Sequence, residues 1–230
     1  MMMDNNHNVE KATGISKFYS KVYGYLGLGI LLSAITSFLV INVFPNEVLG
    51  FVYGGRLNFL LMWGVKIGLV VYLGKNAFSN SGKSLLGYIA YTILTGVTIS
   101  ATVFMYDATD VTLAFVTAAG MFIGMSLVGV FIKKDLSAMG HAMYSFLIGA
   151  LIAIVLNLFV LKSSAVDFAI SLAMVVVFAG LTAWDNQKIK LYYQEMGDQA
   201  GSNLAIYCAM TLYLDLVNLF LSLLRIFGRD

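Results

Sequence analysis

The chain has 230 residues, of which 60% are hydrophobic and 11% are charged, and its mean hydropathy is +0.85. A soluble domain carries about 25% charged residues, and a small water-soluble fold cannot hide so much apolar surface, so this composition excludes one. The net charge of +2 comes without a basic cluster, and the single cysteine, Cys208, excludes a disulfide framework and a Cys-based metal site.

Seven apolar stretches follow one another along the chain, each close to the ~20 residues that cross a hydrocarbon core. They are 22–43, 57–73, 85–106, 111–131, 143–161, 166–184 and 204–227. None shows the period-two polarity of membrane-barrel strands. The first is longer than a signal-peptide core and is expected to be retained. The prediction is an all-α polytopic membrane protein, with a polar cytoplasmic N-terminus over 1–21 and a single seven-helix transmembrane domain over 22–228.

The distribution of Lys and Arg favours a cytoplasmic N-terminus. With that orientation nine basic residues lie inside and four outside. Those inside are Lys11, Lys17, Lys21, Lys75, Lys83, Lys133, Lys134, Lys188 and Lys190, and those outside are Arg56, Lys162, Arg225 and Arg229. The last stretch is the least secure crossing, because Arg225 and Arg229 fit the inside better and would make it re-entrant.

Small residues recur at a spacing of four within three of the stretches. The pairs are Gly96 with Ser100, Gly120 with Gly124, and Gly149 with Ala153. Such pairs let helix backbones approach closely in lipid. They predict close packing within one bundle rather than a dedicated dimer face. No internal repeat stands out, which disfavours an inverted-repeat transporter.

Three ionisable residues, Lys66, Asp185 and Asp215, lie in or at the edge of the apolar stretches. Each costs at least ~2.5 kcal/mol in the bilayer and therefore usually faces a cavity or a partner. Asp215 lies about eleven residues into the last stretch, roughly 16 Å from its start. The alternative is a protonated acid hydrogen-bonded for packing alone. Asn157 and Asn218 are neutral polar companions.

Asp185 is ambiguous by position, because it ends an apolar stretch beside Lys188 and can equally be an interfacial acid. These boundaries put it near the cytoplasmic surface and Asp215 near mid-membrane, so contact requires the preceding helix to extend past 185 or the last one to begin later. Lys66 is expected to neutralise one of the two carboxylates, and the alternative is that it snorkels to the interface.

No pattern points to an enzyme or a bound cofactor. The two histidines, His7 and His141, lack the spacing of a zinc site, and no nucleophile elbow or phosphate loop occurs. Trp-Asp-Asn and Leu-Asp-Leu do not match the Tyr-Asp and Gly-x-Gly-Asp signatures of intramembrane aspartyl proteases.

The ordered set of motifs resembles the Bax inhibitor-1 family, also called the transmembrane Bax inhibitor motif family, over about 17–228. The segments that carry the resemblance are Lys-Lys-Asp-Leu-Ser at 133–137, Asp-Asn-Gln-Lys-Ile at 185–189, Leu-Tyr-Leu-Asp-Leu-Val-Asn-Leu-Phe at 212–220, Leu-Leu-Arg-Ile-Phe-Gly at 223–228, and the run 114–127. The short loops and the end of the chain at Asp230 favour a bacterial inner-membrane member.

The resemblance implies a seven-helix bundle with the seventh helix at its centre, and a pH-sensitive calcium leak. It implies that Asp185 and Asp215 form a hydrogen-bonded pair that senses pH and binds Ca²⁺ transiently. Two carboxyl groups held close cannot both ionise cheaply and titrate as a unit. The hypothesis is that protonation closes the path and deprotonation opens it and leaves a cation site.

The sequence departs from the family in the second stretch, where some members carry an acid and a latching arginine. In this chain, Trp63 or Gly64 occupies the approximate position of that acid. Lys75 is the nearest match to the arginine, although a lysine cannot form the bidentate hydrogen bonds of an arginine. The linker from Asp185 to about Leu204 also looks long.

Two further functions remain open beside the calcium leak. One is a regulator that binds other membrane proteins, such as a protease or stress and cell-death machinery. The other is proton-coupled transport of another solute.

Overall fold

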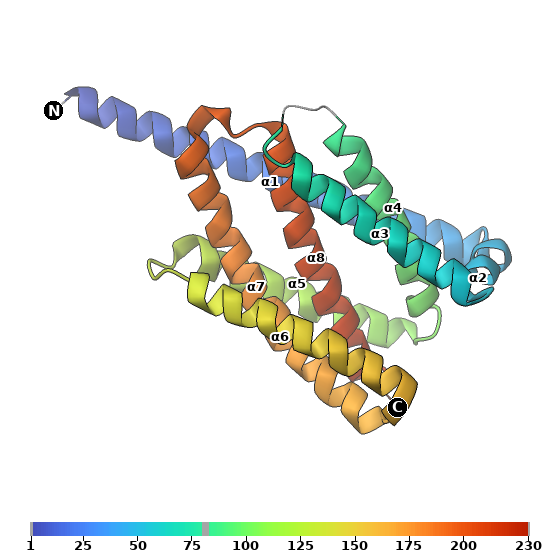
Figure 1. Ribbon diagram of the computed structural model, residues 1–230. Coiled ribbons are helices and arrows are strands. Elements are labelled where there is room, and N and C mark those ends of the chain that lie inside the picture. The colour runs from blue at the N-terminus through green and yellow to red at the C-terminus, as the bar shows by residue number, and fades with distance from the viewer. Residues whose placement is uncertain (1, 80–82, 230) are drawn as a thin grey trace. The chain divides into compact units, whose positions relative to one another are not determined.

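The computed structural model describes residues 2–79 and 83–229, without the side chains at 2–12, 47–49, 53, 56, 59 and 198. Figure 1 shows helices joined by short connections, and the described residues contain no strand, which confirms the all-α prediction. The elements are α1 (Met2–Asn42), α2 (Pro45–Tyr53), α3 (Arg56–Asn76), α4 (Ser84–Val103), α5 (Ala108–Phe131), α6 (Ser137–Leu156), the π-helical turn η1 (Asn157–Leu161), α7 (Ser164–Met196), the 3₁₀ turn η2 (Gly197–Gln199) and α8 (Ser202–Phe227).

Six apolar segments of the described chain are long enough to cross a membrane. They are Thr13–Asn42, Ser84–Val103, Ala108–Phe131, Ser137–Leu161, Ser164–Met196 and Ser202–Phe227. Each overlaps one of the predicted stretches. The remaining stretch, 57–73, falls in the 21-residue helix α3, which includes side chains outside the description. A seventh crossing and a central place for α8 therefore stay predictions.

Two predicted boundaries are wrong, both where a helix continues beyond its apolar part. The first helix does not start at 22, because α1 is helical from Met2 and its apolar segment from Thr13. Likewise α7 does not end at Trp184 but runs to Met196, since the Gln, Lys, Leu and Glu that follow are good helix formers. The long linker predicted after Asp185 is therefore mostly helix. The chain turns at Gly197, whose φ of +54° suits a glycine.

The chain forms two compact units. The first comprises Met1–Met105 and Tyr192–Tyr213. Within it α1 packs closely on α4, where a methyl group on Gly96 would lie 2.7 Å from the Ser33 carbonyl oxygen. The Ser33 hydroxyl lies 2.5 Å from that of Tyr213 and 2.8 Å from the Thr92 carbonyl oxygen. Close approach of helices was thus predicted correctly at Gly96.

The second unit comprises Tyr106–Leu191 and Leu214–Asp230. Here α5 meets α7 at Gly129, where a methyl group would lie 2.0 Å from the Ala183 carbonyl oxygen. A methyl group on Gly120, Gly124 or Gly149 would meet no described atom within 4 Å, so the close packing predicted at those three glycines is wrong. On α5, the glycine that packs closely against a neighbouring helix is Gly129.

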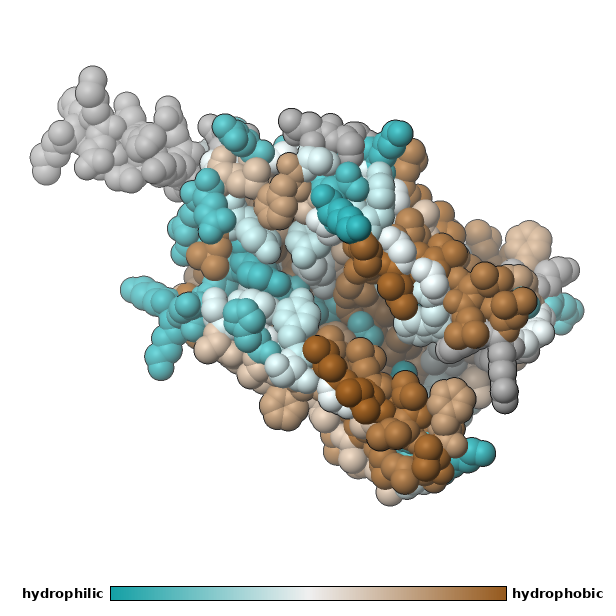
Figure 2. Space-filling model, in the orientation of Figure 1, coloured by the Kyte–Doolittle hydropathy of each residue, from teal (hydrophilic) through white to brown (hydrophobic). Residues whose placement is uncertain are grey.

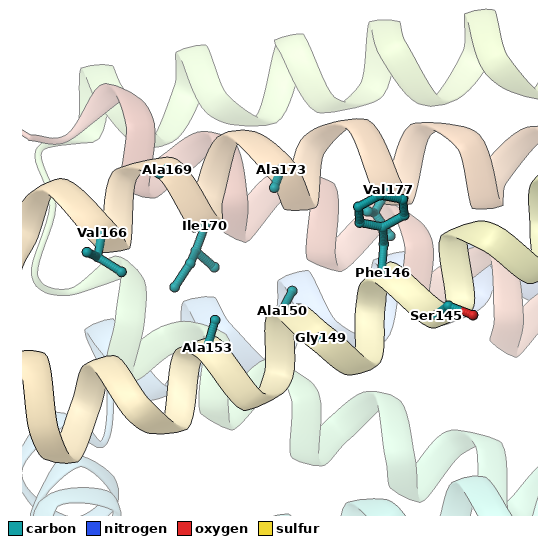
Figure 3. Close-up of a pocket in the computed structure, with 10 residues that line it drawn as sticks. All are labelled: Ser145, Phe146, Gly149, Ala150, Ala153, Val166, Ala169, Ile170, Ala173 and Val177. Atoms are coloured by element: carbon teal, nitrogen blue, oxygen red, sulfur yellow. The ribbon is translucent and has the colours of Figure 1, made fainter.

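Helix α6 exposes most of its apolar side chains, and hydrophobic residues gather along it in Figure 2. It runs beside α7 with a groove of about 570 Å³ between them. Figure 3 shows Ala150 and Ala153 of α6 facing Ile170 and Ala173 of α7 across this groove. No charged side chain lines it, so the groove does not include the aspartates.

Candidate functional site

Asp185 on α7 and Asp215 on α8 lie in the second unit, and each is only 3% exposed. Their carboxyl groups lie near enough to interact electrostatically. One oxygen of Asp215, Oδ2, is buried and has no hydrogen-bond partner among the described residues. Because α7 continues to Met196, Asp185 is an interior residue of its helix rather than its last one. The helix thus extends past Asp185, which is one of the conditions under which contact with Asp215 was expected.

Lys188 supplies the positive charge of this cluster. Its Nζ lies 2.6 Å from Asp185 Oδ1, three residues earlier on α7, and the side chain is 17% exposed. It also interacts electrostatically with Asp215. Residues three apart on a helix share a face, so this spacing predicts the pair once α7 is known to continue. Lys188 was not predicted as part of the site, because the helix was expected to end at Trp184.

The ring of Trp184 lies beneath the Lys188 ammonium, 4.1 Å from Nζ to the ring centroid, and the Tyr144 ring lies 5.7 Å from it. The start of α6 holds the indole in place. A methyl group on Gly140 would lie 1.9 Å from the indole, and the rings of His141 and Tyr144 are each 5.4 Å from it. The lysine therefore has a carboxylate on one side and an aromatic surface on the other.

The two residues after Asp185 fix α7 to its neighbours. Asn186 is fully buried and donates to Ser126 Oγ of α5 at 3.1 Å. Gln187 accepts from the Leu136 N–H and donates to the Lys134 carbonyl oxygen, both at 2.8 Å. Two separate motifs of the sequence, 133–137 and 185–189, thus bind one another directly.

Lys66 and Lys75 lie on α3 in the first unit. Lys66 is 8% exposed, donates to Thr98 Oγ1 at 3.2 Å and lies over the rings of Trp63 and Tyr91, at 5.1 and 5.6 Å from their centroids. Lys75 is in the last turn of α3. That either lysine acts as a counter-charge or a latch for the aspartates stays a prediction.

The two asparagines predicted to support the site form side-chain hydrogen bonds to residues close to them in the sequence. Asn218 donates to the Leu214 carbonyl oxygen, one turn earlier on α8. Asn157 closes the turn between α6 and α7, since its side chain both donates to the Ser163 carbonyl oxygen and accepts from the Ser163 N–H. This turn contains Lys162 at a φ of +48°. Asn157 therefore has a clear structural role.

The described residues contain no cluster of three or more His, Cys, Asp or Glu able to hold a metal ion. Two carboxylates offer at most four oxygens, whereas Ca²⁺ takes 6–8. The chemistry available at the site is that of a buried acid pair with one lysine. It suits proton exchange and brief contact with a cation rather than tight metal binding.

These features define a polytopic α-helical membrane protein with an acid pair enclosed among its helices. Residues 15–230 match the model of the family described as inhibitor of apoptosis-promoting Bax1, and the chain therefore belongs to the Bax inhibitor-1 family.

Similar proteins occur in several bacteria. The chain is 44% identical to the protein YrjE of Lactococcus lactis, over 97% of each chain. It is 36% identical to the inner membrane protein YbhL of Escherichia coli K12, over 96% of this chain and 94% of that one. It is also 36% identical to a membrane protein of Streptococcus pyogenes serotype M1, over 98% and 99% of the two chains. The chain is a multi-pass membrane protein.

Proposed function

We propose that this protein is a pH-sensitive calcium leak of the cell membrane, gated by protonation of Asp185 and Asp215. The observation that carries the proposal is the burial of both carboxyl groups in one cluster, with Asp215 Oδ2 lacking a hydrogen-bond partner among the described residues. Ionisable groups at membrane depth are costly and usually serve a pathway or a proton site.

The charges of the cluster explain how protons gate it. When both aspartates are ionised, they repel, and the single charge of Lys188 cannot neutralise both. One bound proton removes the repulsion and favours the closed arrangement. Loss of that proton leaves hard oxygen ligands for Ca²⁺, too few to retain it, so the ion passes on.

Asp135 is a titratable group between Lys134 and Leu136, which both bond to Gln187, and it does not explain gating near neutral pH. It lies in the connection before α6, where hydrogen bonds from the Ser137 hydroxyl and N–H hold the pKa of its carboxyl below 3.8. A lowered pKa means that its contribution to stability is present above 3.8 and is lost only as the pH falls through the lower value. It stays ionised from pH 6 to 8.

Calcium flux into liposomes containing the purified protein tests the proposal between about pH 6 and 8. We expect wild-type flux to rise several-fold with pH, because loss of the shared proton opens the path in this proposal. Asp185→Asn and Asp215→Asn should each abolish the rise. Asp135→Asn and Asp167→Asn should keep it, since Asp135 does not titrate there and Asp167 is exposed in the first turn of α7. An unchanged pH profile in both pair variants would refute the proposal.

A second candidate function is regulation of another membrane protein. The exposed apolar length of α6 favours it, because such a face suits a partner helix as well as lipid. Flat calcium flux for wild type and all variants would support this candidate. Removal of residues 1–10 adds a second test, because it should spare a leak and weaken a regulator that acts through its N-terminus.

A further inference from the structure

We propose that Lys188 is a tethered competitor for cations at the pair formed by Asp185 and Asp215. Its ammonium occupies the place that an incoming cation needs, and the rings of Trp184 and Tyr144 give it a second resting place when it is displaced. The inference rests on the proposed function, because it assigns the aspartate pair as the cation's contact point.

The position of the ammonium supports competition. Nζ lies 2.6 Å from Asp185 Oδ1, which makes the two an ion pair, and it interacts electrostatically with Asp215. A cation that contacts both carboxylates would lie close to this positive charge and be repelled by it. Asp215 Oδ2 is buried without a partner among the described residues, so it is the oxygen that an added cation can take.

The aromatic surface supports a second position for the lysine. The Trp184 centroid is 4.1 Å and the Tyr144 centroid 5.7 Å from Nζ, so the ring faces still attract the ammonium after Asp185 Oδ1 is taken. The four-carbon stem lets the ammonium move without a change in α7. Gly140 and His141 hold the indole from α6, which keeps this surface in place during the exchange.

Terbium(III), a substitute for Ca²⁺ that emits light when excited through a nearby indole, tests the proposal in detergent. The chain has two tryptophans, and Trp63→Phe leaves Trp184, the residue next to Asp185, as the only one. Every variant is compared in this background. Lys188→Met removes the competing charge, Lys188→Arg retains it, and Lys190→Met removes an exposed charge from the same helix as a matched control.

We expect Lys188→Met to bind terbium about tenfold more tightly than Lys190→Met, because an ion pair no longer has to be broken. Lys188→Arg should bind no more tightly than the background protein. Excess Ca²⁺ should quench the emission in all of them. Lys188→Gln replaces Lys188→Met if the latter does not give a homogeneous protein in detergent.

Equal affinities for Lys188→Met and Lys190→Met would overturn the proposal, and so would weaker binding by Lys188→Met. Asp185→Asn and Asp215→Asn check the site itself, and terbium emission that survives in both would also overturn it. Tighter binding by Lys188→Met without calcium flux in liposomes would reject the leak while leaving the competitor in place. The two failures are therefore distinguishable.

Discussion

Gly129 of α5 is the residue that brings α5 closest to the part of α7 that carries the acid site. A methyl group there would lie 2.0 Å from the carbonyl oxygen and 2.8 Å from the carbonyl carbon of Ala183, two residues before Asp185. These are backbone atoms of a helix, so they cannot rotate away as a flexible side chain can. The lack of a side chain at Gly129 thus fixes the distance between the two helices.

We therefore predict that Gly129→Ala lowers the free energy of unfolding by about 1–3 kcal/mol, the usual cost of an overpacked interface. Gly124→Ala is the matched control on the same helix, because its methyl group meets no described atom within 4 Å. It should be neutral or stabilising by up to about 1 kcal/mol through helix propensity. Equilibrium unfolding in detergent measures both, and a Gly129→Ala protein as stable as Gly124→Ala would contradict the prediction.

Single residues were predictable from the sequence where their chemistry conflicts with their surroundings. Asp215 stands out because a carboxyl group within an apolar stretch is costly in any fold. Lys188 did not stand out, because a lysine after an apolar stretch is ordinary until the helix is known to continue. Gly129 and Gly124 look alike in sequence, since the spacing of small residues does not say which of them faces a neighbouring backbone.

At the scale of elements, Gln187 of α7 determines the course of the connection between α5 and α6. Its Oε1 accepts from the Leu136 N–H and its Nε2 donates to the Lys134 carbonyl oxygen. Two backbone groups outside helical bonding are thereby satisfied by one side chain. The connection is held against α7 immediately beyond Asp185, and α6 begins directly after it at Ser137.

We predict that Gln187→Leu speeds hydrogen exchange of the Leu136 amide by about three- to tenfold, the range that the loss of one hydrogen bond gives. Gln187→Glu keeps the acceptor for the Leu136 N–H and should leave that amide close to wild type. Gln194→Leu, at an exposed position of the same helix, is the control. Hydrogen exchange followed by mass spectrometry measures the protection of the Leu136 amide. Unchanged protection in Gln187→Leu would show that the hydrogen bonds of the Gln187 side chain are not needed to hold the connection.

Element existence was more predictable from the sequence than element length. Six predicted stretches overlap apolar segments long enough to cross a membrane, because about 20 apolar residues have few other uses. The ends of α1 and α7 were missed, since a helix that continues past its apolar part leaves no mark in hydropathy. Helix α2 was missed because its nine residues are too short for a span.

At the scale of the whole molecule, the crossing of α3 decides on which side of the membrane every later connection lies. If α3 crosses and the N-terminus is inside, the connection from α4 to α5 lies outside and that from α5 to α6 lies inside. If α3 does not cross, both are reversed. Lys133 and Lys134 would then lie outside, against the usual distribution of basic residues. This distribution is the physical reason to expect seven crossings.

We predict that a membrane-impermeant thiol reagent on spheroplasts labels Met105→Cys and does not label Ser16→Cys or Ala138→Cys. Met105 lies in the connection from α4 to α5, Ala138 at the start of α6, and Ser16 near the start of the first apolar segment, and all three are exposed. The background carries Cys208→Ala, which removes the one native thiol. Permeabilised cells supply the control, because all three positions should then react. Labelling of Ala138→Cys but not Met105→Cys, with Ser16→Cys still protected, would mean that α3 does not cross and that six helices span the membrane.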